Sequence, residues 1–183
     1  MELICLDVDR ELQLEQLVLG HASELFDQIE LSREHLRPWL AWVDATRSLA
    51  DTRAFLASLK NPGIYEDALV FAIRHHGRLA GTIGFGHGSR DRRKAELGYW
   101  LGRSFVGQGL MTRSCRALID YAFSRTDVNR LEIRCEIRNR KSWAVPERLG
   151  FVLEGIEREG VLVAGTFRDL RVYSMLRREW YRS

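Results

Sequence analysis

The segment from Glu96 to Ala122 constrains the fold most, because a short apolar run, ELGYWLG, leads through a Gly-Gln-Gly loop into an amphipathic helix. The apolar residues that recur on one face and predict a helix over 108–124 are Met111, Cys115, Leu118 and Ala122. Gly107 and Gly109 lack a Cβ, so the loop can turn tightly and a ligand can approach its backbone. The first N–H groups of such a helix have no partner within it and lie at the positive end of its dipole. This arrangement is typical of an anion site, most often for phosphate.

Other interpretations of the glycine loop can be tested against its sequence. A Rossmann dinucleotide loop needs Gly-x-Gly-x-x-Gly, but Thr112 stands at the third glycine position and the preceding strand carries bulky Tyr99 and Trp100. A P-loop needs Gly-Lys-Ser/Thr after four spacer residues, and the chain has no such run. A plain strand–turn–helix connection stays open, because Gly-Gln-Gly alone does not separate it from a phosphate site.

Length and composition suit one domain, residues 1–183, with 45% hydrophobic and 29% charged residues. The apolar runs are too short to span a bilayer, and the start, MELICLDVDRE, lacks the basic region of a signal peptide. A net charge of +3 is weak and does not argue for nucleic acid binding, which would need a clustered basic face with stacking aromatic residues. The widely spaced Cys5, Cys115 and Cys135 are expected as small buried hydrophobes in a reducing cytoplasm, without a disulfide or a zinc site.

The N-terminal half predicts helices followed by a strand hairpin. The expected elements are an extended segment over 11–18, helices over 21–30 and 33–36, and a helix from the Ser48–Asp51 capping signal to residues 61–63. Strands over 67–74 and 79–87 are expected to pair, and the first reads as central because both of its faces are apolar. Trp39 and Trp42 are interpreted as core or lid packing.

A metal site is not expected at His75 and His76, which form the turn of this hairpin. Adjacent residues of an extended chain point to opposite sides, and no carboxylate partner is evident from the sequence.

The C-terminal half predicts a second strand–helix–hairpin series. A strand over 129–138 alternates apolar and charged residues, so one of its faces should be solvated. A short helix is expected over 143–149, with Pro146 in its first turn and Gly150 closing it. Strands over 151–163 and 166–177 read as a long hairpin, followed by a polar tail.

The order of these elements and three motifs resemble the GNAT superfamily of acetyl-CoA-dependent N-acetyltransferases, and more narrowly its RimJ/RimL group, which acetylates protein N-termini. The motifs are RKAELGYWL at 93–101, GQGLMT at 107–112 and NRKSWAVPERLGF at 139–151, together with HLRPW at 35–39. The resemblance covers nearly the whole chain. It implies an α/β fold with a mixed, mainly antiparallel central sheet and flanking helices. It also implies that strands 95–102 and 129–138 run parallel and splay apart where the cofactor binds.

The sequence departs from the family pattern at three positions. Ser104 stands where the family's loop often has Gln or Arg, and Val106 stands where many relatives carry Arg, Lys or Gln. Both changes remove side-chain help but keep the backbone donors for phosphate. Pro146 stands where many GNAT enzymes carry a tyrosine acid, which excludes that acid here.

By resemblance, the pyrophosphate of acetyl-CoA binds the backbone of residues 107–112, the main chain of strand 99–101 binds the pantetheine arm, and Asn139 holds that arm from the other side. The cofactor-binding residues expected are Tyr99, Trp100, Leu101, Val106, Gly107, Gln108, Gly109, Leu110, Met111, Thr112, Asn139 and Ser142. Ser142 is the expected acid for the CoA thiolate, with a helix N-cap as its alternative role. Glu159 is the first candidate base and Glu96 the second. No metal is needed, because transfer from a thioester to an amine is already downhill.

The resemblance implies an N-acetyltransferase that uses acetyl-CoA as co-substrate and acts on the N-terminal amine of a ribosomal or other cytoplasmic protein. A small amine, such as a polyamine, aminoglycoside or amino acid, is the alternative acceptor. A domain that binds acetyl-CoA without turnover is the alternative outside enzymes. Neither a membrane nor nucleic acid is expected as a partner, and a homo-oligomer stays open. A flat groove would favour a protein tail, and a closed acidic pocket a cationic small molecule.

Overall fold

The computed structural model describes residues 3–59, 63–65 and 69–181. Their strands form one sheet in the order β1-β2-β3-β4-β5-β6-β8-β7, antiparallel throughout except for the parallel pair β5–β6. The strands are β1 (Cys5–Asp7), β2 (Leu12–Gln16), β3 (Val70–His75), β4 (Arg78–Ser89), β5 (Lys94–Leu101), β6 (Arg130–Glu136), β7 (Val152–Val163) and β8 (Thr166–Leu176). The helices are α1 (Ala22–Leu36), α2 (Leu49–Ser58), α3 (Leu110–Arg125), α4 (Arg140–Arg148) and α5 (Arg177–Trp180). The predicted mixed, mainly antiparallel sheet with flanking helices is confirmed.

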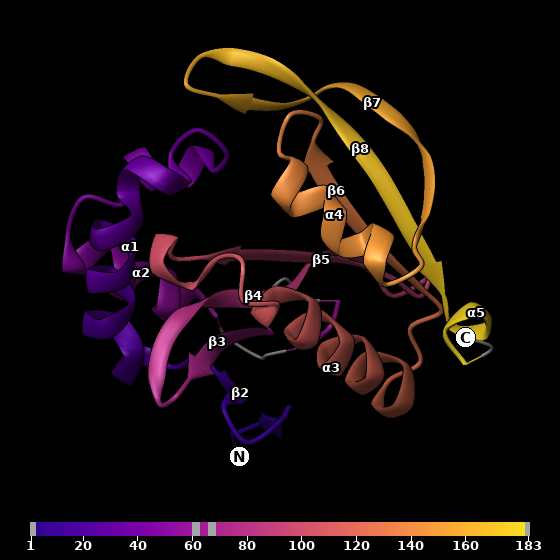
Figure 1. Cartoon of the computed structure of the whole chain (residues 1–183), viewed down its shortest axis with the longest axis horizontal. Coiled ribbons are helices and arrows are strands. Elements are labelled where there is room, and N and C mark those ends of the chain that lie inside the picture. The colour runs from indigo at the N-terminus through magenta and orange to yellow at the C-terminus, as the bar shows by residue number, and fades with distance from the viewer. Residues whose placement is uncertain (1–2, 60–62, 66–68, 182–183) are drawn as a thin grey trace.

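Helices cover both faces of the sheet, and the side chains of strand β3 pack with helices on each face. Phe71 and Ile73 belong to the apolar cluster that includes the buried side of α3, whereas Ala72 belongs to the cluster built with α1 and α2. Because successive side chains of a strand point to opposite faces, β3 must be apolar on both. The expected central strand is therefore confirmed. Figure 1 shows α1 and α2 together at one side, α3 and α4 away from them, and the β7–β8 hairpin projecting beyond the sheet.

The N-terminal helices differ from the prediction in one respect. Residues 22–36 form one continuous helix, so the separate helix over 33–36 was wrong. The buried stripe includes the polar Gln28 and Ser32, whose side chains hydrogen-bond each other at 3.0 Å, and they interrupt the apolar pattern. The capping signal is confirmed, since Ser48 Oγ accepts from the Asp51 N–H at 3.3 Å at the start of α2. Residues 60–62, where that helix was expected to end, lie outside the described residues, and α2 ends at Ser58.

The C-terminal half contains two corrections. Strand β6 was expected to have one solvated face, yet Glu132 is only 4% exposed because Lys94, Arg130 and Arg134 surround its carboxylate. The chain after β8 was expected to be a polar tail. It instead forms α5, where Trp180 is buried and donates its indole N–H to Asp120 at 2.6 Å. In both places tertiary contacts bury groups that the sequence marks as polar.

The cysteines and the helix lengths can also be compared with the predictions. Cys115 and Cys135 are buried as expected, but Cys5 is exposed on the edge strand β1, so the expectation was wrong for that cysteine. Across the described residues, every helix is too short or too polar to cross a bilayer.

Candidate active site

The site is organised by the point where β5 and β6 part. Their parallel register pairs Lys94 with Arg130, Ala95 with Leu131 and Glu96 with Glu132. Strand β5 then continues to Leu101 and β6 to Glu136 without further pairing between them within residues 69–181. The predicted splay of this parallel pair is therefore confirmed. From Leu97 to Leu101, β5 pairs with β4 along one edge and leaves the edge that faces β6 unpaired.

The glycine loop follows β5 and leads into α3. Gly107 and Gly109 have φ angles of 81° and 72°, which non-glycine residues rarely adopt, and a Cβ at either position would meet no atom within 4 Å. Helix α3 begins at Leu110 directly after Gly109 and has no acidic residue in its first turn. Arg148 of α4 donates to Thr112 Oγ1 at 2.7 Å, which brings a positive charge to this helix start. Open space, free N–H groups and a nearby cation suit an anionic group such as a phosphate.

The side chains of the loop divide between core and surface. Leu110 and Met111 are buried in the core, so only their backbones are available to a ligand. Gln108 turns its amide back to the Ser104 carbonyl at 3.0 Å, which braces the loop. The helix starts two residues later than predicted, because the positive φ of Gly109 is not helical.

Ser142 lies in α4 beside the splay, and its N-cap alternative is wrong. Asn139 is the N-cap, and its Oδ1 accepts from the Ser142 N–H at 3.3 Å. The Ser142 hydroxyl instead donates to the Cys135 thiol of β6 at 3.2 Å. Burial raises the pKa of the Cys135 thiol to about 11, so it stays protonated near neutral pH. Because Asn139 Oδ1 caps α4, the Asn139 side chain has less hydrogen-bonding capacity left for a ligand.

Tyr99 connects β5 to α4 across the gap. Its hydroxyl donates to the Ser142 carbonyl at 2.9 Å, and burial holds the pKa of its phenol well above the usual value. That carbonyl lacks its ordinary helical partner, because Pro146, four residues on, has no N–H. Pro146 was expected in the first turn, but α4 begins at Arg140 and the proline lies inside the helix. The proline therefore frees a carbonyl that Tyr99 then satisfies.

A cavity of about 680 Å³ opens on the other side of β5, between the α1–α2 side and β3, β4 and β5. Its lining includes Glu96, His87, Tyr99 and Trp100, together with residues of α1, α2 and the 3-10 helix η2 (Ala41–Asp44). Trp42 of η2 lies against Trp100, with ring centroids 6.0 Å apart, which agrees with its interpretation as lid packing. Tyr99 belongs to the cavity lining and its hydroxyl contacts α4 beside the splay, so this residue of β5 connects the two regions.

Glu96 of β5 is one of the ionisable groups that line this cavity. Burial raises the pKa of its carboxyl above the usual value, although Arg134, at 3.4 Å, and His87 act in the opposite direction. His87 comes from an irregular stretch of β4, where the register shifts after the pair Gly86–Glu96 and His87 has a φ of 47°. Such a bulge re-aims a side chain. His87 was not predicted as a site residue, because its only signal in the sequence was its place at the end of a predicted strand.

Glu159, the other expected base, lies on the exposed β7–β8 hairpin. It has a φ of 54°, its N–H donates to Asp169 Oδ1 at 2.8 Å, and it is not among the residues that line the cavity. The hairpin projects beyond the sheet in Figure 1, and its turn at Ala164 and Gly165 is the predicted one. Glu96 thus lines the cavity, Ser142 lies on α4 against β6, and Glu159 lies on the hairpin outside the cavity lining.

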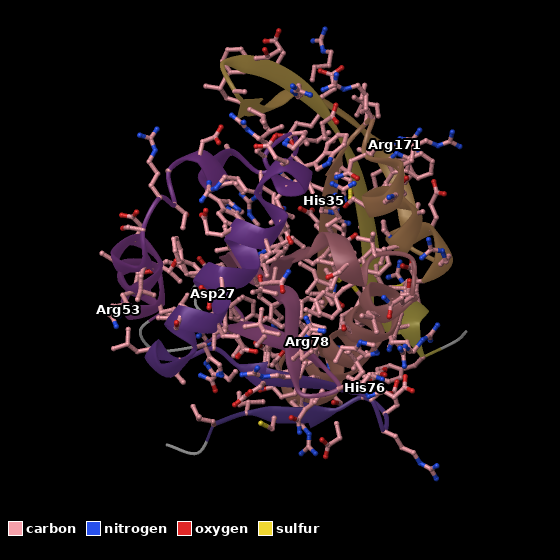
Figure 2. The ribbon with its side chains drawn as sticks, turned by 60° about the vertical axis from the view of Figure 1, so that its left-hand side comes forward. Asp27, His35, Arg53, His76, Arg78 and Arg171 are labelled. Atoms are coloured by element: carbon pink, nitrogen blue, oxygen red, sulfur yellow. The ribbon has the colours of Figure 1, made fainter. Side chains whose placement is uncertain are left out.

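His35, of the HLRPW run, lies in the last turn of α1 and is labelled in Figure 2. Burial, followed by the positive charges of Lys141 and Arg103, lowers the pKa of its imidazole. Lys141 belongs to α4, and Arg103 to the 3-10 helix η3 (Arg103–Phe105) that precedes the glycine loop. The end of α1 therefore lies near both α4 and η3.

The histidine pair at the β3–β4 turn contradicts the argument made from alternation. His76 has a φ of 48°, so it leaves the extended conformation, and its ring centroid lies 4.4 Å from that of His75. Glu11 supplies the carboxylate that the sequence did not reveal, 3.9 Å and 3.8 Å from the two Nε2 atoms. We call these residues the Glu11 cluster. It is outside the cavity lining, and His76 lies at the opposite end of the molecule from the β7–β8 hairpin in Figure 2.

Comparison with known proteins identifies the family. Residues 11–152 match the acetyltransferase (GNAT) domain. The chain belongs to the GNAT acetyltransferase family. It is 35% identical to YdaF, a candidate ribosomal N-acetyltransferase of Bacillus subtilis (strain 168), over 94% of this chain and 95% of the relative. It is 28% identical to the ribosomal-protein-serine acetyltransferase of Escherichia coli (strain K12), over 92% and 94% of the two chains.

Solved structures agree with the sequence relatives. RimL, the ribosomal L7/L12 alpha-N-protein acetyltransferase, in complex with coenzyme A joined to a cysteine by a disulfide, superposes with a TM-score of 0.88 at 28% identity, covering 96% of this chain and 98% of RimL. The microcin C7 self-immunity acetyltransferase MccE, in complex with acetyl-CoA and AMP, gives a TM-score of 0.86 at 29% identity, covering 92% and 94%. The protein is an acetyl-CoA-dependent N-acetyltransferase of the RimL group.

Proposed function

We propose that this GNAT enzyme, acting as one catalytic domain, acetylates the N-terminal amine of a protein, with a ribosomal protein as the leading candidate. The observation that carries the proposal is that the described lining residues of the acceptor cavity include two acidic groups, one of which is committed to the start of α2. Only Asp51 and Glu96 among those residues are acidic. Asp51 accepts from the N–H groups of Arg47 and Ser48 at 3.0 and 2.9 Å, and Glu96 pairs with Arg134.

A polycation has little to bind in such a cavity. The hydrogen bonds from Ser48 and Arg47 lower the pKa of the Asp51 carboxyl, which shows that its charge already serves the start of α2. A polyamine or an aminoglycoside presents several cations, whereas the described lining residues offer Glu96 alone, because Asp51 is committed to the start of α2. An N-terminal peptide presents one amine, and that matches the single carboxylate of Glu96. The names of the relatives, which include ribosomal-protein serine and alanine acetyltransferases, point to the same acceptor.

The proposed mechanism assigns one proton transfer to each side of the splay. An α-amine has a pKa of about 8, so a substantial fraction is neutral at pH 7 and a carboxylate of raised pKa suffices to remove the proton that leaves during attack. Glu96 is the group in the cavity that can take it. On the other side, the Ser142 hydroxyl lies against the Cys135 thiol beside the splay, where the sulfur of coenzyme A would have to lie for this role. Ser142 would protonate the departing thiolate there.

The residues also fit acetyl-CoA itself. The backbone N–H groups that follow Gly109 and the cation of Arg148 suit the pyrophosphate, and the unpaired edge of β5 offers main-chain partners to the pantetheine arm. The other expected contacts of the pantetheine arm and of the phosphates stay predictions: Val106, Gly107, Gln108, Thr112 and Asn139. The thioester supplies the activated acetyl group.

An acceptor screen tests the proposal. N-terminal peptides of ribosomal proteins, spermidine, an aminoglycoside and free amino acids would each be offered with acetyl-CoA, and thiol release and product mass would be measured. We expect kcat/KM to be highest for peptides and acetylation to fall on the α-amine. A polyamine or aminoglycoside that outperforms every peptide would refute the proposal.

A further inference from the structure

The walls of the acceptor cavity are more apolar than an amine substrate requires. The apolar side chains that dominate its lining include Leu25, Ile29, Trp42, Phe55, Phe85 and Trp100. Trp42 and Phe55 are 39% and 46% exposed, although both belong to this lining. Aromatic rings held open to solvent around a cavity gain most when an apolar ligand covers them.

One buried polar atom in the same lining lacks a partner. Thr52 of α2 is only 1% exposed, and its Oγ1 has no hydrogen-bond partner among the described residues. A buried hydroxyl without a partner is costly, so such a group marks a place where a ligand completes the bonding. Thr52 therefore adds one polar contact to an otherwise apolar wall, the composition typical of a specific small-ligand pocket.

The volume also exceeds what the reacting amine needs. Ligand pockets commonly occupy roughly 300–1,000 Å³. At about 680 Å³, this cavity accommodates a large side chain besides the amine at Glu96. The space lies between β5 and the α1–α2 side, so it extends away from the splay where the thioester would lie.

We propose that the cavity selects acceptor peptides that carry a bulky apolar or aromatic side chain within their first two residues, with Thr52 donating to the peptide backbone. This inference rests on the proposed function, because it names the peptide class that the same site takes. The side chain packs against Phe55, Trp42 and Trp100, and this packing holds the amine at Glu96. Residues further along the peptide leave through the open side of the cavity.

A matched peptide series tests the selection. Peptides that begin with Ser would carry Gly, Ile, Phe or Trp at the second position, and a parallel set would vary the first position with Gly second. We expect kcat/KM for the best bulky peptide to exceed that of Ser-Gly by at least about 10-fold, since one methylene in an apolar pocket is worth about 10–200-fold. Phe55→Ala should reduce this ratio several-fold. Phe167→Ala is the control, because Phe167 is also exposed, on β8, and is not part of the cavity lining; it should leave the ratio unchanged.

Thr52→Val tests the polar contact separately. The variant keeps the shape of the side chain and removes a hydroxyl that has no partner among the described residues, so its thermal stability should be unchanged or higher. Its kcat/KM for bulky peptides should fall about 10-fold if the hydroxyl binds the peptide. A wild-type rate for Thr52→Val would remove Thr52 from the proposal.

The outcomes distinguish this inference from the proposed function. If all peptides are acetylated with equal kcat/KM, the selection by apolar side chains is refuted while N-terminal acetylation stands. If Phe55→Ala and Phe167→Ala have the same effect on the ratio, the cavity is not where the selection occurs, and the inference is also refuted. If no peptide is acetylated but a small amine is, the proposed function itself fails.

Discussion

Replacing Tyr99 by Phe tests the hydrogen bond that joins β5 to α4. The substitution removes the donor to the Ser142 carbonyl, which Pro146 leaves without a helical partner. A buried acceptor left unpaired costs about 1–3 kcal/mol, so Tyr99→Phe should lower the free energy of unfolding by that amount. The decisive prediction is that Pro146→Ala relieves this cost. The alanine introduced by that substitution has an N–H that can donate to the Ser142 carbonyl in the ordinary helical manner.

A double-mutant cycle measures the relief. Urea unfolding of the wild type, both single variants and the double variant gives the coupling energy, which we expect to be at least about 1 kcal/mol. Tyr65→Phe is the matched control. Its hydroxyl donates to Asp127 at 2.8 Å, a bond to which Pro146 does not contribute, so Tyr65→Phe and Pro146→Ala should be additive. If Tyr99→Phe and Pro146→Ala are also additive within about 0.5 kcal/mol, the proline does not free the carbonyl and the reasoning is refuted.

The remaining predictions concern the site directly. Gly109→Glu and Gly165→Glu should each lower the free energy of unfolding by about 1–2 kcal/mol, since both glycines have φ above 70°. Only Gly109→Glu should abolish CoA binding in calorimetric titration, because its carboxylate would repel the phosphates. Equal CoA affinity in both variants would make the glycine loop a simple turn. Ser142→Ala should lower kcat by about 10²–10⁴-fold without a matching loss of CoA affinity, and an unchanged kcat would remove it from the mechanism. Because burial raises the pKa of Glu96, kcat/KM should fall as the pH drops through that pKa. In Glu96→Gln this fall of kcat/KM at acidic pH should be absent. If the fall is instead absent only in Glu159→Gln, the base lies on the hairpin. Dialysis against a chelator should leave kcat unchanged, because the Glu11 cluster is not part of the cavity lining; a loss restored by Zn²⁺ would contradict this.

The raised pKa of Glu96 also predicts how Glu96→Gln changes the stability of the fold. A carboxyl whose folded-state pKa is raised contributes stability below its unfolded pKa and loses it as the pH rises through the folded value. At pH 7 the ionised Glu96 therefore weakens the fold, and a neutral glutamine should not lower the melting temperature even as it slows turnover.

Local signals in the sequence determined most of the architecture. The alternation in β3 and β6, the glycines before α3 and the capping pair at α2 each depend on neighbours within a few residues, so their spacing predicts the element directly. The motifs over 93–101, 107–112 and 139–151 led to the GNAT family, whose parallel splay the structure confirms. Ser142 and Glu96 were predicted as catalytic residues in this way, because they lie within those motifs, and their roles stay predictions.

Tertiary structure alone decided what each polar residue does. Glu132 and Trp180 read as surface residues, yet packing and ion pairs bury them. His87 enters the cavity only because of a bulge in β4, and Glu11 meets two histidines only because β2 lies beside β3. Pro146 frees a carbonyl that a residue 43 positions away from Ser142 in sequence satisfies. Such contacts depend on distances between elements far apart in the chain, and no local pattern records those distances. The sequence therefore determined the elements and the family, whereas the acceptor cavity exists only once the sheet and helices are assembled.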